Sequence, residues 1–220
     1  MIKAVIFDLD GTLLDREKTL ANFISSQYDE FHAHFSHISK KDFCSRFREL
    51  DNRGYNWKDY VYTSLIREFN IESISQKDLL NHYIEHFHTY CVSFPNLLSM
   101  LEQLKKLSLS LGIISNGRGQ FQMDNIISLG INNYFNSILI SEWEEMKKPD
   151  PRIFEKALRQ LKVDAEETIF IGDHPTNDIL AAKNIGLKTI WKRDDYWAAP
   201  SADYVIDDLA EIPHLIANLN

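Results

Sequence analysis

The stretch that decides the fold is VIFDLDGTLLD, which runs from Val5 to Asp15. Three apolar residues lead directly into Asp8 and Asp10, and Gly11 then allows the chain to turn. A short apolar run bounded by such a turn is typical of a buried strand in a parallel sheet. Two carboxylates so close together repel one another unless a cation neutralises them or one holds a proton. The stretch therefore predicts a strand that ends in a charged site.

Length and charge limit the classes of protein to consider. The chain has 220 residues, which is enough for one core domain with an insertion. Its formal charge of −8 argues against general affinity for nucleic acid or for an anionic membrane surface. Cys44 and Cys91 have no metal-type spacing, and the apolar start is too short for a signal peptide or a membrane span. We expect a reduced, cytoplasmic protein.

The chain divides into two parts with different sequence patterns. Residues 16–93 contain amphipathic, aromatic-rich segments of helical length and no convincing strand. We expect helices there over 17–36, 40–51, 57–69 and 75–92. Residues 1–15 and 94–220 instead alternate short apolar strands with helices, which is typical of a parallel sheet covered on both faces. The sequence thus predicts an α/β core of residues 1–15 and 94–220, into which a helical domain of residues 16–93 is inserted.

The strands of the α/β part can be placed individually. They are expected at 3–7, 110–115, 137–140, 168–173, 188–191 and 203–207. The helices between them are expected at 96–106, 120–129, 152–161 and 179–185. Parallel sheets bind ligands at the carboxyl ends of their strands.

Polar clusters follow several of these predicted strands: DLDGT after the first, SNG after the second and GDHPTND after the fourth. A fourth cluster, KKPDP, precedes a helix. Taken alone, D-x-D-G-T has a lesser alternative, in which it is a turn whose aspartate caps a helix. Together, the clusters place Asp8, Asp10, Asp173 and Asp178 at one edge of the sheet. Oxygen ligands of this kind suit Mg²⁺ with a substrate phosphate, and a carboxylate can act as the nucleophile in phosphoryl transfer.

The segments DLDGTLLD, GIISNG, KKPDP and GDHPTNDILAAKNIG resemble the four sequence motifs of the haloacid dehalogenase superfamily. The resemblance spans the whole α/β part, and it implies a Rossmann-like core with a mobile helical cap inserted after the first strand. It also implies a Mg²⁺-dependent phosphatase that passes through an aspartyl phosphate. The general appearance is similar to the branch that contains nucleotide 5′-phosphatases and N-acylneuraminate 9-phosphatase.

The resemblance assigns the chemical roles. Asp8 would be the nucleophile. Asp10 would be protonated at the start, as general acid toward the leaving oxygen, and would then act as general base toward water. Lys148 would neutralise Asp8 and the phosphate. Mg²⁺ would be held by Asp8, Asp173 and the backbone carbonyl of Asp10.

The remaining motif residues would bind the phosphate or support the site. Ser115 and the backbone N–H groups of Asn116 and Gly117 would hold the phosphoryl oxygens. Thr12 would bond to the carboxylate of the nucleophile. Asp178 would lie just outside the ligands, where it orients Lys148 or a water molecule on the metal.

Other reactions of the same superfamily remain as alternatives. A phosphosugar mutase keeps both aspartates, although REKTLANF after the first motif looks closer to the hydrolases. Dehalogenases lack the second aspartate, so Asp10 argues against that reaction. A non-catalytic binding protein would normally have lost one of the motif residues, and none is missing here.

The substrate is expected to be a small phosphate ester, such as a nucleotide or a sugar phosphate, for a protein that is a monomer or a homodimer. The predicted cap carries nearly balanced charge, and CSRFRELDNRG contains Arg46 and Arg53. These two share a helix face if the helix extends that far. One of them is a candidate contact to a polar or anionic part of the substrate, although a solvated helix face is the simpler interpretation.

Overall fold

A computed structural model describes residues 1–220, which divide into two compact units. The first comprises Met1–Asp15 with Val92–Asn220, and the second comprises Arg16–Cys91. The second unit therefore starts at the residue where the sequence places the inserted domain, and it ends two residues before the expected boundary at residue 93. Each unit is described separately below.

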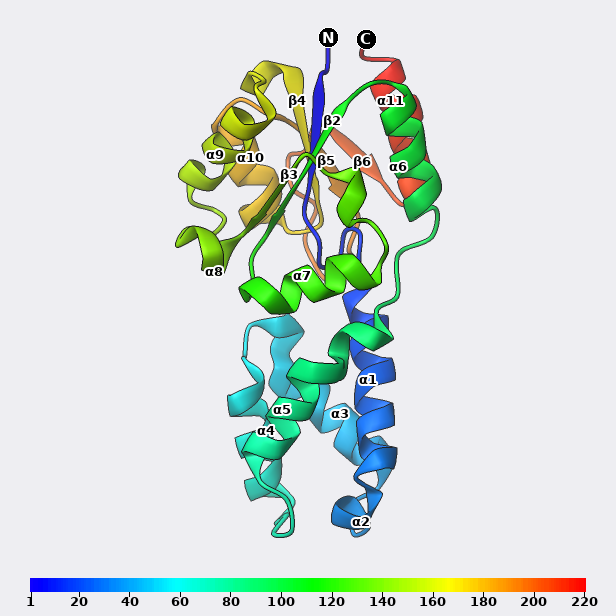
Figure 1. Ribbon diagram of the computed structural model, residues 1–220, viewed down its shortest axis with the longest axis vertical. Helices are drawn as coiled ribbons and strands as arrows, with labels where there is room; N and C mark the ends of the chain where they lie inside the picture. Colours follow the sequence, from blue (N-terminus) through cyan, green and yellow to red (C-terminus); the bar gives the residue numbers. More distant parts are fainter. The chain divides into compact units, whose positions relative to one another are not determined.

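A six-stranded sheet forms the centre of the first unit (Figure 1). All neighbouring strands are parallel, and the spatial order is β3-β2-β1-β4-β5-β6. The strands are β1 (Ala4–Phe7), β2 (Ser110–Ser115), β3 (Ser137–Ile140), β4 (Thr168–Gly172), β5 (Lys188–Lys192) and β6 (Tyr204–Ile206). Each end lies within one residue of its prediction. The expected α/β class and parallel sheet are confirmed.

The strand order places β1 at the point where the chain changes direction across the sheet. After β1 the chain adds β2 and β3 on one side, and it then crosses to β4 on the other side. Phe7 at the end of β1 pairs with Ile113 of β2 and Ile171 of β4, so these three strands end close together. Ligands of open parallel sheets bind at such a switch point. The residues that follow β1, β2 and β4 are therefore brought to one place.

Helices cover both faces of the sheet. They are α6 (Leu97–Lys106), α7 (Gly119–Ser128), α8 (Ser141–Glu144), α9 (Pro151–Leu161), α10 (Ala181–Asn184) and α11 (Ile212–Ala217). Figure 1 shows α9 and α10 on one side of the sheet, with α6 and α11 on the other. The sheet is buried on both faces: every residue of β1 and β4 is buried, and β1 is apolar throughout.

Two features of these helices differ from the prediction. The expected helix over 179–185 begins earlier, as a π-helical segment Pro175–Leu180 that runs into α10. Short α8 and α11 were not predicted, because four and six residues give too little periodicity to distinguish a helix from a loop.

The second unit consists of helices only. They are α1 (Arg16–Glu30), α2 (His32–Phe35), α3 (Lys40–Asp51), α4 (Lys58–Glu68) and α5 (Gln76–His86), followed by a 3₁₀ turn at Phe87–Tyr90. The predicted single helix over 17–36 is in fact interrupted at Phe31, between α1 and α2. Ser39 begins α3 as a helix cap, because its side chain accepts a hydrogen bond from the Asp42 N–H.

Aromatic side chains form the interior of this unit. The rings of Phe35 and Phe43 stack with centroids 4.7 Å apart, and Phe23 meets Tyr83 edge to face at 5.1 Å. Such pairs contribute about 0.5–1.5 kcal/mol each beyond the apolar area that they bury. The aromatic residues of α1, α2, α3 and α5 therefore hold the helices together.

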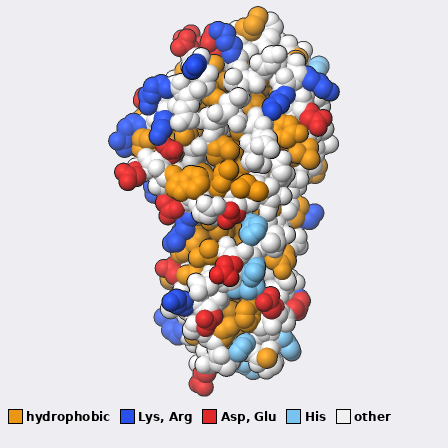
Figure 2. All heavy atoms as spheres, viewed as in Figure 1, with side chains coloured by type: hydrophobic (Ala, Val, Ile, Leu, Met, Phe, Trp, Pro, Cys, Tyr) orange, Lys and Arg blue, Asp and Glu red, His pale blue; other side chains and the backbone are white.

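Histidines gather on the surface of the helical unit, as the face drawn in Figure 2 shows. His34 and His37 connect the end of α2 to the segment around the end of α4, through Ser73 Oγ at 2.7 Å and the Phe69 carbonyl at 2.8 Å. Both rings thus bond to neighbouring helix ends.

No helix of either unit combines the length and the apolar character needed to span a membrane.

Candidate active site

Asp8 and Lys148 form a buried ion pair at the end of β1. The backbone N–H of Asp8 donates to the Ile171 carbonyl at 2.9 Å, which continues the sheet by one residue and fixes the start of the side chain. Lys148 Nζ lies 2.5 Å from Asp8 Oδ1 and 2.7 Å from Asp178 Oδ1. Lys148 and Asp178 are almost completely buried. The structure therefore brings Lys148 into contact with two residues that lie 140 and 30 positions from it in sequence.

The segment that carries Lys148 is held in place by the start of α9 and by the side chain of Asn116. Asp150 caps α9 through the Arg152 N–H, and Pro151 takes the first helical position, where no N–H is needed. The Asn116 side chain pairs with the Lys148 backbone in both directions: Nδ2 donates to the carbonyl at 2.8 Å, and Oδ1 accepts the N–H at 2.9 Å. Sequence reasoning had used only the backbone of Asn116, so this function of its side chain was missed.

Asp173 and Asp178 are positioned by the chain that follows β4. Trp191 Nε1 donates to the Asp173 carbonyl at 2.7 Å, which ties this loop to β5. Asp178 Oδ2 accepts the His174 N–H at 3.0 Å, and His174 Nδ1 accepts the N–H groups of Thr176 and Asn177 at 3.1 Å each. The loop therefore presents both carboxylates with their backbone fixed.

The resemblance predicts a bond from Thr12 to the carboxylate of Asp8, and the structure does not show this bond. The Thr12 hydroxyl donates to Asp173 Oδ1 at 3.3 Å instead. The reason is the turn at Gly11, which has φ +85° and passes so close to Asp173 that a Cβ at Gly11 would lie 2.6 Å from Oδ2. The DGT segment therefore packs against the β4 loop, and the hydroxyl of Thr12 faces the aspartate there.

Asp10 is held by a residue that sequence reasoning did not single out. Gln122, on α7, donates from Nε2 to Asp10 Oδ2 at 2.5 Å and to Ser115 Oγ at 2.7 Å. Gln122 and Asn125 are both buried and lie three residues apart on α7, on the same face as Ile126. Polar residues on an otherwise apolar helix face were the available signal, but a single glutamine has too many ordinary explanations to be chosen on that basis.

The backbone of the SNG segment differs in one respect from the expectation. The Gly117 N–H donates to Ser141 Oγ at 2.9 Å, and the Ser141 hydroxyl donates back to the Gly117 carbonyl at 3.1 Å. The N–H that was predicted to hold phosphate already has an acceptor at the start of α8, directly after β3. Ser115 is buried beside Gln122, as described above.

The site carries more negative charge than it can balance. Asp8, Asp173 and Asp178 are all buried, with ligand oxygens within 4.8 Å of one another, so the group could hold a metal ion. Burial raises the pKa of Asp8 to about 7, although Lys148 opposes this, and burial with the charges of Asp8 and Asp178 raises the pKa of Asp173 well above its ordinary value. Burial lowers the pKa of Lys148, but the two carboxylates that it contacts outweigh burial and raise it. Lys148 therefore stays charged, and a further cation would relieve the excess.

The two arginines proposed in the helical unit do not share a helix face. Arg46 is partly exposed and bonds to Glu68 at 2.6 Å and to Glu49 at 2.8 Å. Helix α3 ends at Asp51, and Arg53 follows it with φ +56°, so the condition for a shared helix face is not met.

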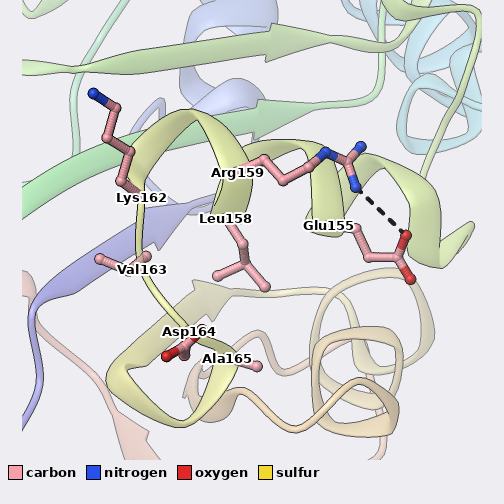
Figure 3. A pocket seen from close by; sticks show the side chains of 7 residues that line it. All are labelled: Glu155, Leu158, Arg159, Lys162, Val163, Asp164 and Ala165. Atoms are coloured by element: carbon pink, nitrogen blue, oxygen red, sulfur yellow. Dashed lines mark ion pairs between the residues drawn. The ribbon is translucent and has the colours of Figure 1, made fainter.

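A shallow hollow lies elsewhere on the first unit (Figure 3). Its volume is about 420 Å³, and it is lined by the end of α9 and the segment that leads into β4. The lining residues are Glu155, Leu158, Arg159, Lys162, Val163, Asp164 and Ala165. It lies near the amino end of β4, whereas Asp173 follows the carboxyl end of that strand. The hollow is therefore separate from the carboxylate site.

The chain is similar to known proteins over most of its length. The family described as haloacid dehalogenase-like hydrolase matches residues 5–192. The chain is 31% identical to the glyceraldehyde 3-phosphate phosphatase of Pyrococcus furiosus, over 100% of this chain and 95% of that protein. The enzyme of the same name from Pyrococcus abyssi is 33% identical over 87% of this chain and 81% of its own length.

The chain is also similar to solved structures over nearly its whole length. A HAD phosphatase from Thermococcus onnurineus has a TM-score of 0.70 with 25% identity, covering 98% of each chain. A 2-haloacid dehalogenase from Pseudomonas syringae has a TM-score of 0.64 with 27% identity over the full length of both chains.

Proposed function

This chain belongs to the haloacid dehalogenase-like hydrolases and is a phosphatase, and from that premise we propose that it hydrolyses a small phosphate monoester by way of a phosphorylated Asp8. The observation that carries the proposal is the contact of one buried ammonium, that of Lys148, with the carboxylates of both Asp8 and Asp178. This contact keeps Asp8 near a fixed positive charge, which a phosphoryl group also needs.

The carboxylate group fits Mg²⁺. Asp178 uses Oδ1 for Lys148 and Oδ2 for the His174 N–H, whereas Asp8 uses only Oδ1 and Asp173 only Oδ1. The second oxygens of Asp8 and Asp173 therefore remain for the cation, together with the Asp10 carbonyl that the family resemblance adds. Bound Mg²⁺ supplies positive charge that offsets the excess of buried carboxylate and stabilises the phosphoryl oxygens. In this proposal Asp178 supports Lys148 and does not bind the ion.

The reaction proceeds in two balanced steps. In the first, an oxygen of Asp8 attacks phosphorus, the ester P–O bond breaks, and Asp10 gives its proton to the leaving oxygen. In the second, Asp10 removes a proton from water as the water oxygen attacks the phosphorus. The bond between phosphorus and Asp8 then breaks, and inorganic phosphate is released. Asp10 ends with the proton that it lost.

The phosphate contacts follow from the residues around Asp8. The Ser115 hydroxyl and the Asn116 N–H remain proposed donors to the phosphoryl oxygens. The Gly117 N–H is left out of the proposal, because Ser141 accepts its hydrogen bond. The helical unit is proposed as the cap of this family, and a contact from Arg46 or Arg53 to the substrate stays a prediction.

The nature of the substrate is suggested by the relatives. Several relatives are named glyceraldehyde 3-phosphate phosphatase, and others are named pyrophosphatase or phosphoserine phosphatase. We infer that the substrate is a small phosphorylated metabolite. Triose phosphates and other sugar phosphates should be assayed first, and nucleotides after them.

The central test is Asp8→Asn, assayed with p-nitrophenyl phosphate and with the best ester from a panel of phosphomonoesters. The change keeps the shape of the side chain but removes the nucleophile, so kcat should fall by at least about 1,000-fold. EDTA should suppress the wild-type enzyme until Mg²⁺ is restored. Activity that survives both treatments would contradict the proposal.

Dehalogenation is a second candidate, because one similar structure is that of a 2-haloacid dehalogenase. Chloride release from 2-chloropropionate by the wild-type protein would support it. We expect none, since Asp10 is fixed by Gln122 beside Ser115, and a carbon–halogen bond has no leaving oxygen that needs its proton.

A further inference from the structure

The side-chain amide of Gln122 uses its hydrogen-bonding groups within the site. Its two N–H bonds serve two acceptors, Asp10 Oδ2 at 2.5 Å and Ser115 Oγ at 2.7 Å. Its oxygen accepts from Asn125 Nδ2 at 2.9 Å, and the side chain is only 3% exposed. This acceptance also sets the orientation of the amide, because Oε1 must face Asn125 and Nε2 must face the site. Gln122 therefore joins the loop that follows β1 to the last residue of β2.

We propose that Gln122 is a positioning residue, which aligns Asp10 for proton transfer and the Ser115 hydroxyl for phosphate binding. The inference rests on the proposed function, since it assigns Gln122 a task within that reaction. Gln122 itself touches neither the reacting atoms nor the metal. Its effect passes through the two side chains that it contacts.

The contact with Asp10 selects one carboxyl oxygen. Oδ2 already receives an N–H, so the oxygen that remains for the leaving group is Oδ1. A side chain without this bond can rotate about its terminal torsion, which is broad for aspartate. Misplacement of a reacting group by about 1 Å costs up to about 100-fold in rate. A fixed carboxyl is most valuable for esters whose leaving group depends on the proton.

The contact with Ser115 directs a hydroxyl proton. A serine hydroxyl has one donor and two acceptor positions, and Gln122 fills one of the acceptor positions. The proton is then available to a phosphoryl oxygen. This contribution is the same for every ester, because all of them share the phosphate group.

Close packing keeps the amide in place. A Cβ at Gly117 would lie 2.6 Å from Gln122 Cγ, so the loop after β2 leaves room for this side chain only because residue 117 is glycine. Asn125, which is fully buried, supports the amide from one turn further along α7. The arrangement thus leaves the amide little freedom to move.

The test compares two esters in the full-length enzyme with Mg²⁺. Gln122→Met keeps the length of the side chain but removes its donors. We expect kcat/KM for glycerol phosphate, which has a poor leaving group, to fall about 10- to 100-fold, and that for p-nitrophenyl phosphate to fall about threefold. Asp10→Asn, which removes the acid itself, should shift the ratio of the two esters in the same direction and further. The inhibition constant of inorganic phosphate should rise with Gln122→Met and not with Asp10→Asn.

Two further variants keep the test decisive. Gln120→Ala is the matched control, because Gln120 lies on the same helix but is exposed and bonds to Asp124; both esters should be unaffected. Asn125→Ala retains Gln122 and removes only its support, so the ester ratio should shift in the same direction but less. Asn125→Ala replaces Gln122→Met in the test if Gln122→Met does not fold, as judged by circular dichroism.

An equal loss for both esters, or no loss, overturns the positioning role of Gln122 and leaves the proposed phosphatase activity standing. Activity in Asp8→Asn overturns the proposed phosphatase mechanism instead.

Discussion

At the scale of single residues, Gly11 shows how closely the DGT turn and the β4 loop are fitted. Its φ is +85°, in the left-handed region, and a Cβ would meet the Asp173 carboxylate at 2.6 Å. Gly11→Ala should therefore displace Asp173. We expect it to weaken the apparent affinity for Mg²⁺, so that the Mg²⁺ concentration needed for half-maximal rate rises about 10-fold or more. A Mg²⁺ titration of the phosphatase activity measures this directly.

Gly130 offers a matched control for Gly11. Its φ is +72°, but nothing lies within 4 Å of the position that a Cβ would take. Gly130→Ala should cost about 1–2 kcal/mol in the free energy of unfolding for the left-handed backbone alone, with an unchanged Mg²⁺ titration. Equal Mg²⁺ titrations for the two variants would show that the close approach to Asp173 has no catalytic importance.

Strand ends marked some of the site residues in the sequence, and the resemblance to the superfamily motifs added others, such as Lys148 and Asp178. Asp8, Ser115 and Asp173 lie at or directly after buried apolar runs, so their convergence follows from a parallel sheet. The partners of Thr12 and Gln122 depend on how a turn and a helix approach neighbouring loops. That approach is a matter of tertiary packing, and no local pattern of residues encodes it.

At the scale of elements, the helical unit is tied together by one buried carboxylate. Asp51, the last residue of α3, accepts hydrogen bonds from Arg16 of α1 at 3.0 Å and also bonds to Lys58 of α4. Burial alone would raise the pKa of Asp51, but the charges of Arg16 and Lys58 hold it below its ordinary value. Three helices therefore meet at one charge.

Asp51→Ala should be strongly destabilising. It removes the carboxylate that both cations contact, while Lys58 stays 1% exposed. Breaking a buried pair in this way typically costs about 3–5 kcal/mol. Urea unfolding followed by circular dichroism checks the prediction. Asp29→Ala is the control, because Asp29 and its partner Lys40 are exposed and such pairs contribute little. Similar midpoints for the two variants would contradict a structural function for the buried cluster.

Some predicted elements agree with the structure at both of their ends. The ranges of β2, β3 and α3 match their predictions residue for residue, because each is a strong pattern with a clear stop. The helix predicted over 17–36 breaks at Phe31. The sequence does not reveal this break, because the aromatic periodicity continues across it. A periodic pattern indicates which face is buried, and it does not show where the backbone bends.

At the scale of the whole molecule, the buried carboxylates make stability depend on pH. The native state raises the pKa of Asp8 from 3.8 to about 7, and Asp173 is raised as well. Between these pH values the native protein binds more protons than the unfolded chain, so the free energy of unfolding falls as pH rises. The opposite shift at Asp51 acts only below its ordinary pKa of 3.8, and that of Lys148 acts above 10.5. The metal-free protein should therefore be more stable near pH 5 than near pH 8.

Thermal unfolding in EDTA at these two pH values measures the effect, and Mg²⁺ identifies its source. We expect the wild-type Tm to be lower at pH 8 by about 3 °C or more, which corresponds to roughly 1 kcal/mol in a chain of this size. A divalent cation binds the ionised carboxylates, so Mg²⁺ should raise Tm more at pH 8 than at pH 5. Asp8→Asn removes one titrating group and one proposed ligand, and it should reduce both the pH dependence and the response to Mg²⁺. If the metal-free wild type instead gains stability from pH 5 to pH 8, burial of these carboxylates does not govern the balance.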